Sequence, residues 1–226
     1  VVFCVVLGYA DIGPFGSIKN KTPHLDRMAK EGMRLTDFYS TCPVCTPSRA
    51  SLMTGCYPKR VGMHQHVLFP TSKKGLNPEE HTIANHLKSQ GYATACFGKW
   101  HLGHQPEVLP TSQGFDTYLG IPYSNDMNHP DNKGKPQGGF KGMDLLWADP
   151  ESTLTKWKTP LIENETIVEL PVDQRTVTRR YTQRAIDFVT EHQDEPFLVY
   201  LPHSMPHIPL YVPNDVRDPD PLNAYI

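Results

Sequence analysis

The sequence predicts an α/β fold in which helices flank a central, mainly parallel sheet. Short apolar runs typical of buried strands alternate along the chain with segments that carry helix start and stop signals. Such alternation is typical of parallel strands joined by crossover helices. The 22 prolines among 226 residues exclude a bundle of long helices, because prolines at this frequency interrupt helices and favour fixed loops.

Three apolar runs are the expected buried strands, and a fourth strand is expected from alternation. The runs are residues 1–7, Tyr92–Trp100 and Phe197–Leu201, which have the composition of strands covered on both faces. Met33–Tyr39 alternates like a half-buried strand. The run at residues 1–7 is too short to cross a membrane and lacks the basic start and cleavage site of a signal peptide.

Four helices are expected between and after these strands. In the first, Thr22 can act as the cap, Pro23 suits the first position and Gly32 can end the helix. Its apolar stripe consists of Leu25, Met28 and Ala29. The other three helices are expected at Thr46–Gly55, Thr82–Gln90 and Arg175–His192. The last is amphipathic, with its core-facing residues expected at Val177, Tyr181, Ile186 and Val189.

Composition and charge exclude several classes of protein. An apolar share of 38%, with 10% aromatic residues, is enough for a sizeable core. A net charge of -2 argues against nucleic acid as the main partner, and no apolar run reaches the length of a membrane span. The five cysteines are an odd number, so at least one is expected to stay free or to serve chemistry.

Reactive side chains follow several of the expected strands, where ligand sites of such sheets lie. They belong to the turn at Cys45, the segment Lys99–His101 and the loop His203–His207. These three segments are therefore the candidates for an active site. The polar stretch Asn128–Lys141 is expected to be a surface excursion, and the excursion, extended to Trp157, would shape the pocket.

Cys45 comes immediately before a helix that opens with Pro47. A helix N-terminus offers free N–H donors and a partial positive charge, which favour an oxyanion or a thiolate. Arg49 falls in the first turn, where it could bridge back to the Cys45 side chain or to an anion. A buried cysteine ahead of an ordinary capped helix is the alternative interpretation of the Cys-x-Pro pattern alone.

The segment Cys45–Gly55, CTPSRASLMTG, resembles the signature of the formylglycine-dependent sulfatase family. Further matches are Leu7–Asp11, Thr22–Asp26, Gly98–Gly103, Gln113–Asp116 and Gly120–Ser124. The resemblance covers almost the whole chain and is nearest to the arylsulfatase A and N-acetylgalactosamine-6-sulfatase branch. It implies an alkaline-phosphatase-like sandwich, of which residues 1–226 would be the N-terminal part of the catalytic domain, without its remainder and the C-terminal subdomain.

The resemblance also implies a reaction, the hydrolysis of aryl or carbohydrate sulfate esters. A formylglycine-generating enzyme would oxidise Cys45 to formylglycine, whose hydrated aldehyde attacks sulfur and then expels sulfate. A divalent cation, usually Ca²⁺ but also Mg²⁺ or another ion, would bind the formylglycine and a sulfate oxygen. By family resemblance the protein would be secreted, periplasmic or lysosomal. Glycosylation sequons at Asn20 and Asn164 are weak support for passage through the secretory pathway.

Four more residues take roles by this resemblance. Lys99 and His101 lie two apart and would project together from an extended chain; the ammonium suits a sulfate oxygen, and the histidine the diol or the leaving oxygen. Ser124 would lie near the sulfate, and His207 would bind it and donate a proton, with His203 the weaker candidate. Surface or packed side chains without a role are the alternative for each. The pairs His203/His207 and His64/His66 suggest zinc, but lack the carboxylates or cysteines of a zinc site.

The sequence departs from the family at the cation site. The family has two adjacent aspartates between the first strand and the segment Leu7-Gly8-Tyr9, whereas this chain has Val5-Val6-Leu7. Either valines replace the aspartates, or an Asp-Asp dipeptide is missing between Val6 and Leu7, which is the preferred explanation. Asp11 is nearby but is not at the ligand position. A second Asp-Asn pair would lie beyond Ile226, so the chain alone is expected to be inactive.

Two further functions remain open. One is a phosphate- or phosphonate-ester hydrolase of the same superfamily, because formylglycine enzymes can turn over either ester. The other is an inactive pseudo-sulfatase that binds sulfated glycans, which the missing acidic pair favours.

Overall fold

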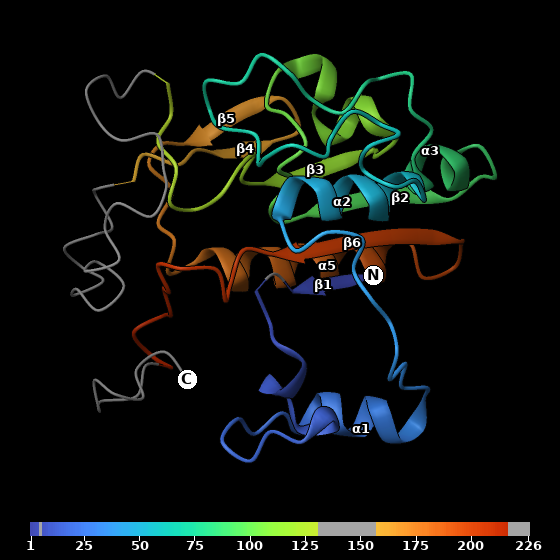
Figure 1. Ribbon diagram of the computed structural model, residues 1–226, viewed down its shortest axis with the longest axis vertical. Helices are drawn as coiled ribbons and strands as arrows, with labels where there is room; N and C mark the ends of the chain where they lie inside the picture. The colour runs from blue at the N-terminus through green and yellow to red at the C-terminus, as the bar shows by residue number, and fades with distance from the viewer. Residues whose placement is uncertain (5, 131–156, 217–226) are drawn as a thin grey trace.

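A computed structural model describes residues 1–4, 6–130 and 157–216 (Figure 1). In these ranges six strands form one sheet in the order β1-β6-β2-β3-β4-β5. Their bounds are β1 Val2–Cys4, β2 Ala93–Phe97, β3 Thr117–Gly120, β4 Leu161–Glu163, β5 Thr166–Glu169 and β6 Phe197–His203. Strands β1, β6, β2 and β3 are parallel, whereas β4 and β5 pair antiparallel. The sheet is therefore mixed and mainly parallel, as the sequence predicts.

The described helices occupy the four expected places. They are α1 Pro23–Glu31, α2 Cys45–Thr54, α3 Ile83–Lys88 and α5 Val177–Glu191. Short 3-10 turns lie at Tyr9–Asp11, Gly13–Phe15, Pro106–Val108 and Pro110–Gln113. Helix α3 begins at a capping box between Thr82 and Asn85, and α2 ends at Gly55, whose φ of 68° the missing Cβ permits. None of these helices is long and apolar enough to cross a membrane.

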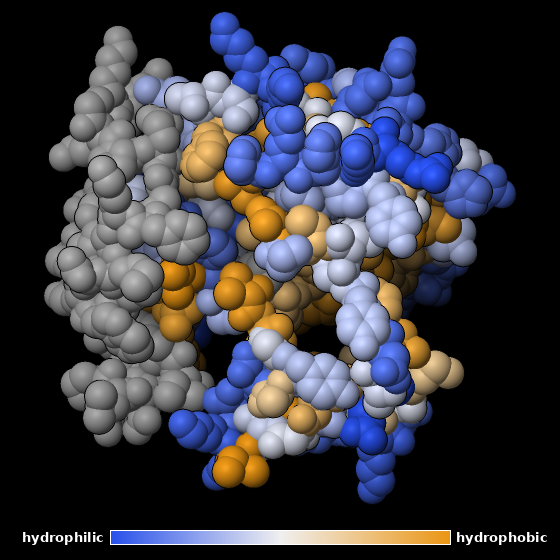
Figure 2. All heavy atoms as spheres, in the orientation of Figure 1, coloured by the Kyte–Doolittle hydropathy of each residue, from blue (hydrophilic) through white to orange (hydrophobic). Residues whose placement is uncertain are grey.

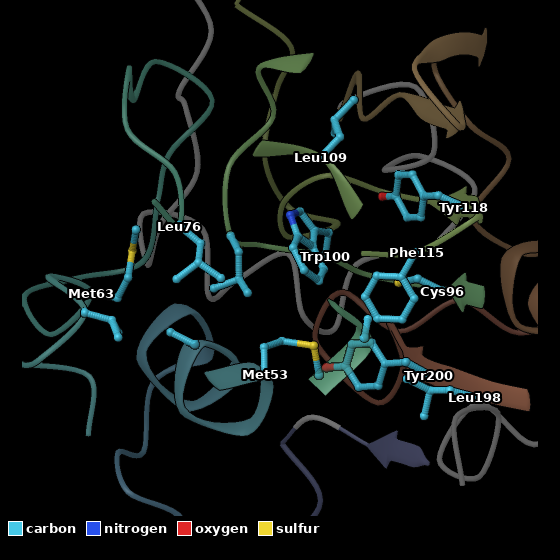
Figure 3. Packing of buried hydrophobic residues seen from close by; sticks show 14 of the residues in the cluster. Met53, Met63, Leu76, Cys96, Trp100, Leu109, Phe115, Tyr118, Leu198 and Tyr200 are labelled. Atoms are coloured by element: carbon cyan, nitrogen blue, oxygen red, sulfur yellow. The ribbon is translucent and has the colours of Figure 1, made fainter. Parts of the chain in front are cut away.

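Two apolar layers hold the sheet between helices. In Figure 1, α2 lies in front of the sheet and α5 behind it. Alternate residues of each central strand supply the two layers: Cys96 of β2 packs on the α2 side, whereas Ala95 and Phe97 pack on the α5 side. Figure 3 shows the α2-side layer, where Met53, Trp100, Phe115 and Tyr200 gather. Helices therefore cover both faces of the sheet from which the segments after β2 and β6 leave.

Several sequence-based expectations are wrong in detail. Residues 33–39 form no strand and remain exposed, with Phe38 74% accessible, because no strand of the described sheet lies beside them. Residues 1–7 contain only the short strand β1, an edge strand on which Val2 is 68% exposed. The strand expected up to Trp100 ends at Phe97. Helix α5 exposes Ile186 and Val189, because Val177, Tyr181, Ala185 and Phe188 share its buried face instead.

Helix α1 is also less buried than its stripe suggests. None of its residues is buried, and Met28 is 68% exposed. Thr22 does not cap the helix through its side chain; its hydroxyl lies 3.3 Å from Asp26 Oδ1 and accepts from the Gly13 N–H. Figure 2 shows an open gap between this helix and the main body, where apolar side chains are visible.

Strands β3, β4 and β5 were not expected, and the antiparallel strands β4 and β5 form the far edge of the sheet. Asn164, with φ of 54°, forms the β4–β5 turn, and its Oδ1 accepts from the Tyr118 N–H at 2.9 Å. The surface excursion expected from Asn128 lies, over 131–156, outside the described residues. At its base the His129 N–H donates to the Lys158 carbonyl at 2.9 Å, so the two ends of the excursion meet beside the sheet.

Val6 is the most strained position near β1. Its φ is 61°, a left-handed conformation that costs a β-branched residue about 1–3 kcal/mol, while its side chain is 66% exposed and loses little by replacement. We expect Val6→Asn to raise the free energy of unfolding by about 1 kcal/mol, because asparagine tolerates this region. Val2→Asn is the matched control, since Val2 is 68% exposed within a strand. Urea unfolding in which both variants lose equal stability would contradict the assignment of strain.

Candidate active site

Cys45 is the first residue of α2 rather than the residue before it. The Ser48 N–H donates to the Val44 carbonyl at 3.0 Å, which closes the first turn around Cys45. The thiol is free and half-buried. Cys45 therefore belongs to the first turn of the helix, where backbone N–H groups lack intrahelical partners.

The segment 98–101 continues from β2, and its first residues lie between β3 and β6. Gly98 N–H donates to the Leu119 carbonyl at 2.9 Å, and Lys99 N–H to the Pro202 carbonyl at 2.8 Å. Gly98 has φ of 142°, and a Cβ there would lie 2.1 Å from the Pro202 oxygen, so only glycine fits. His101 has φ of 61°. The argument from alternation along a regular strand therefore does not apply to Lys99 and His101.

A chain of hydrogen bonds joins Lys99, Ser124 and His207. Lys99 Nζ donates to Ser124 Oγ at 2.6 Å, and Ser124 Oγ lies 3.3 Å from His207 Nε2. His207 Nδ1 lies 2.7 Å from the Ile208 carbonyl, which can only accept, so Nδ1 carries the proton. In neutral His207 the Nε2 atom then accepts from the Ser124 hydroxyl.

Lys99 also contacts Cys45, with Nζ 3.5 Å from Sγ. The lysine is fully buried. Its pKa is lowered to about 8, chiefly by burial and also by the Arg49 charge, although Cys45 and Asp126 act in the opposite direction. The Lys99 ammonium therefore lies where it could contact the negative charge of an anion bound beside Cys45.

His101 is fully buried and neutral. Burial lowers its pKa well below the usual value, and the charges of Lys99 and Arg49 add to the effect. Its Nε2 lies 2.9 Å from the Leu68 carbonyl and so carries the proton, whereas its Nδ1 is buried without a partner. The free Nδ1 lone pair can accept a proton. Burial, followed by the Lys99 charge, lowers the pKa of His207 to about 3, so His207 is also neutral at physiological pH.

Arg49 is buried and does not bridge back to Cys45. Its Nη1 donates to the Lys99 carbonyl and lies 3.5 Å from the Tyr200 hydroxyl. The guanidinium stacks over the Phe3 ring of β1 at 5.1 Å. Its Nε and Nη2 atoms are buried without a partner. The structure thus places a permanent positive charge next to Lys99 rather than against the thiol.

Two residues near the site were missed in the sequence. Thr46, fully buried, donates to the His101 carbonyl at 2.8 Å and accepts from the Leu68 N–H at 3.1 Å. Asp126 is largely buried, its Oδ1 has no partner, and its charge acts on Lys99. The position of Thr46 inside the Cys45 motif was an available signal, whereas nothing in the sequence distinguishes Asp126 from other loop carboxylates.

The site geometry can be compared with known proteins. A family model described as Sulfatase matches residues 6–223. The chain belongs to the sulfatase family. Arylsulfatase G of Rattus norvegicus is 40% identical over 225 residues, which cover 97% of this chain and 43% of that protein. Arylsulfatase A of Homo sapiens is 38% identical over 93% of this chain and 41% of its own length. The chain thus spans less than half of these relatives.

Solved structures confirm the fold of this sulfatase-family chain. A Pseudoalteromonas sp. sulfatase, PsFucS1, superposes with a TM-score of 0.76 at 26% identity, over 99% of this chain and 47% of its own. The protein Ps i-CgsB, in complex with k-i-k-neocarrahexaose, gives a TM-score of 0.75 at 30% identity, over 95% and 46%. The expected alkaline-phosphatase-like architecture is therefore confirmed.

The family implies a divalent cation, but the described donors do not fit one. No group of three or more His, Cys, Asp or Glu that could hold a metal occurs in the part of the chain that the structure describes. After β1 the chain presents Val6 and Leu7, both exposed, where the family has carboxylates. Asp11 is engaged locally, its Oδ2 accepting from the Gly8 N–H at 2.6 Å. Around Cys45 the nearest charge is the Lys99 ammonium, which repels a cation.

The candidate zinc histidines do not form such a site either. His203 ends β6, and its Nδ1 is buried without a partner; burial lowers its pKa. The pair His64 and His66 is likewise outside any metal-ligating group in the described ranges. The zinc alternative is therefore not supported.

The Thr46 hydroxyl offers a test of how α2 is tied to the segment 98–101. Thr46→Val keeps the shape but leaves the His101 carbonyl and the Leu68 N–H without their partner. We expect a loss of unfolding free energy on the order of 2 kcal/mol, since both groups are buried. Thr46→Ser retains the hydroxyl and should lose less. Equal losses in urea unfolding for the two variants would mean that methyl packing, rather than hydrogen bonding, makes this connection.

The charge of Lys99 should cost stability in a pH-dependent way. Its pKa is 10.5 in a free lysine and about 8 in the fold, so below pH 8 both states are protonated and the fold bears the full cost of burying the charge. Between the two values only the folded state releases the proton, and stability rises with pH. Lys99→Met should therefore stabilise the chain at pH 7 by roughly 1–3 kcal/mol, with the gain fading above pH 10.

The measurement is the difference in unfolding free energy between variant and wild type across this pH range. Lys30→Met is the control, because Lys30 is exposed on α1 and should give no pH-dependent difference. A gain for Lys99→Met that does not change with pH would show that the buried charge is not its cause.

Proposed function

We propose that the protein to which this chain belongs hydrolyses sulfate esters, with a formylglycine made from Cys45 as the nucleophile. The observation that carries the proposal is the buried Lys99 ammonium, which lies between Cys45 Sγ at 3.5 Å and Ser124 Oγ at 2.6 Å. A desolvated cation beside the nucleophile suits a sulfate group in both its ground and transition states. The chain would supply the N-terminal part of the catalytic domain.

When present, formylglycine supplies a hydrated aldehyde whose hydroxyl attacks sulfur. The free Nδ1 of neutral His101 can accept a proton from a hydroxyl at that position, which makes His101 the candidate general base. Thr46 and Leu68 hold its backbone and ring in place. Arg49 donates a hydrogen bond to the Lys99 carbonyl. It would thereby position the lysine and add a second positive charge behind it.

Lys99, Ser124 and His207 would hold the sulfate oxygens. Lys99 donates directly, and the Ser124 hydroxyl is oriented by its hydrogen bond to His207 Nε2. The resemblance to the family gives His207 the role of proton donor to the leaving oxygen. This role requires Nε2 to gain a proton, which the approach of a dianion would favour against the effects of burial and Lys99.

The substrate class remains that of the family, aryl or carbohydrate sulfates. Relatives carry the names arylsulfatase and, for a Mus musculus protein that is 35% identical, N-acetylgalactosamine-6-sulfatase. The complex of Ps i-CgsB with an oligosaccharide supports a glycan substrate. A formylglycine-generating enzyme would be the maturation partner, and a secreted, periplasmic or lysosomal location would suit it. The described donors support no step through a divalent cation.

An inactive, sulfate-binding protein is the second candidate, favoured by the Val5-Val6-Leu7 sequence in place of carboxylates. A phosphate-ester hydrolase is distinguished by comparing aryl phosphate with aryl sulfate.

Modification of Cys45 tests the proposal most directly. In a host with a formylglycine-generating enzyme, the Cys45-containing peptide should lose mass, because the aldehyde replaces the CH₂–SH group, while Cys96 stays unchanged. A longer protein that includes residues 1–226 should hydrolyse an aryl sulfate, and Cys45→Ala should abolish this by several orders of magnitude, roughly the share supplied by a covalent nucleophile.

Mass spectrometry and a chromogenic sulfate assay measure these outcomes. An unmodified Cys45 in a converting host, together with intact sulfate binding, would favour the pseudo-sulfatase. Hydrolysis by the 226-residue chain alone at the rate of an intact sulfatase would contradict the view that the remaining catalytic domain is needed.

A further inference from the structure

Two buried cations without a salt-bridging carboxylate lie near Cys45. Arg49 and Lys99 are both fully buried, and no carboxylate in the described ranges lies within salt-bridge distance of either. The Arg49 Nε and Nη2 atoms have no partner. Asp126 is the carboxylate whose charge acts on Lys99. Buried charges are normally paired, so these two cations lack salt-bridging negative charge.

The turn after β1 is where that charge is missing. Phe3 lies under the Arg49 guanidinium at 5.1 Å, so the end of β1 reaches the cation. There the chain presents apolar residues: Val6 is 66% exposed with φ of 61°, and Leu7 is 38% exposed. This left-handed conformation is strained for a β-branched residue.

We infer that the site beside Cys45 takes a sulfate-type dianion on the Lys99 ammonium, with the Arg49 charge behind it and without a bridging divalent cation, and that the turn between Val6 and Leu7 is the cause. The inference rests on the proposed function, that this pocket receives a sulfate group. It departs from the cation dependence that the family implies.

Electrostatics favours this arrangement. A divalent cation placed near Cys45 would meet Lys99 at close range and Arg49 behind it. Among the described residues only the Asp126 carboxylate acts against the Lys99 charge, and it forms no salt bridge with the lysine. A dianion in the same place is attracted by both. The Ser124 hydroxyl and the rings of His101 and His207 are neutral groups at the site, and the unprotonated nitrogen atom of each ring is an acceptor.

The test measures binding of inorganic sulfate to the 226-residue chain by isothermal titration calorimetry. One buffer contains EDTA and the other millimolar CaCl₂, each with NaCl to match ionic strength. We expect the same sulfate dissociation constant in both buffers and no heat from calcium alone. Lys99→Met should weaken sulfate binding by about tenfold to a hundredfold, the range of one charged hydrogen bond, whereas Lys30→Met should not.

Two insertions between Val6 and Leu7 test the cause. An Asp-Asp insertion restores carboxylates at the end of β1 and should make sulfate binding calcium-dependent, by about tenfold or more. An Asn-Asn insertion has the same length without the charge and should show no calcium response. Circular dichroism and thermal unfolding verify that both insertion variants fold.

The outcomes separate the inference from the proposed function. Sulfate binding to the unaltered chain that strengthens about tenfold with calcium would overturn the inference and leave the proposed function standing. Absence of sulfate binding in both buffers, or binding that Lys99→Met does not weaken, would contradict the proposed anion site itself. A lack of calcium response after the Asp-Asp insertion would overturn the assignment of the missing charge to this turn.

Discussion

The hydrogen bond from the buried Arg49 guanidinium to the Lys99 carbonyl is the contact on which the site depends. It joins α2, which carries Cys45, to a segment that follows β2 some fifty positions later. The Thr46 hydroxyl makes a second tie, to the His101 carbonyl. Because a charged donor gives a strong hydrogen bond to a backbone acceptor, the two segments keep a fixed distance. Cys45 and Lys99 therefore face each other without any direct salt bridge.

Much of the fold could be predicted from local patterns. Helices α1, α2, α3 and α5 lie where caps, prolines and glycines indicate, because these signals act within a few residues. Residues 33–39 show the limit, since alternation predicts a strand only if a neighbouring strand exists to pair with. Strands β3–β5 are three or four residues long, too short to give a periodic signal.

The site was predictable in its members more than in its geometry. Resemblance selected Cys45, Lys99, Ser124 and His207, and the structure brings these residues together. The prediction that Lys99 and His101 project together from a regular strand is wrong, because Gly98 and the φ of His101 interrupt the strand. Thr46 acts through backbone groups far away in sequence, and such contacts depend on tertiary structure rather than on any local pattern.

The two buried cations of the site differ from their apolar surroundings. Two apolar layers cover the central sheet on both faces, yet Arg49 and Lys99 are buried beside them without a salt-bridging carboxylate. A fold that is consistent elsewhere tolerates such a conflict where function requires it. A bound anion would offset the cost of desolvating Lys99. Anion binding and folding stability are therefore thermodynamically linked, and a ligand that neutralises both cations stabilises the chain in proportion to its affinity.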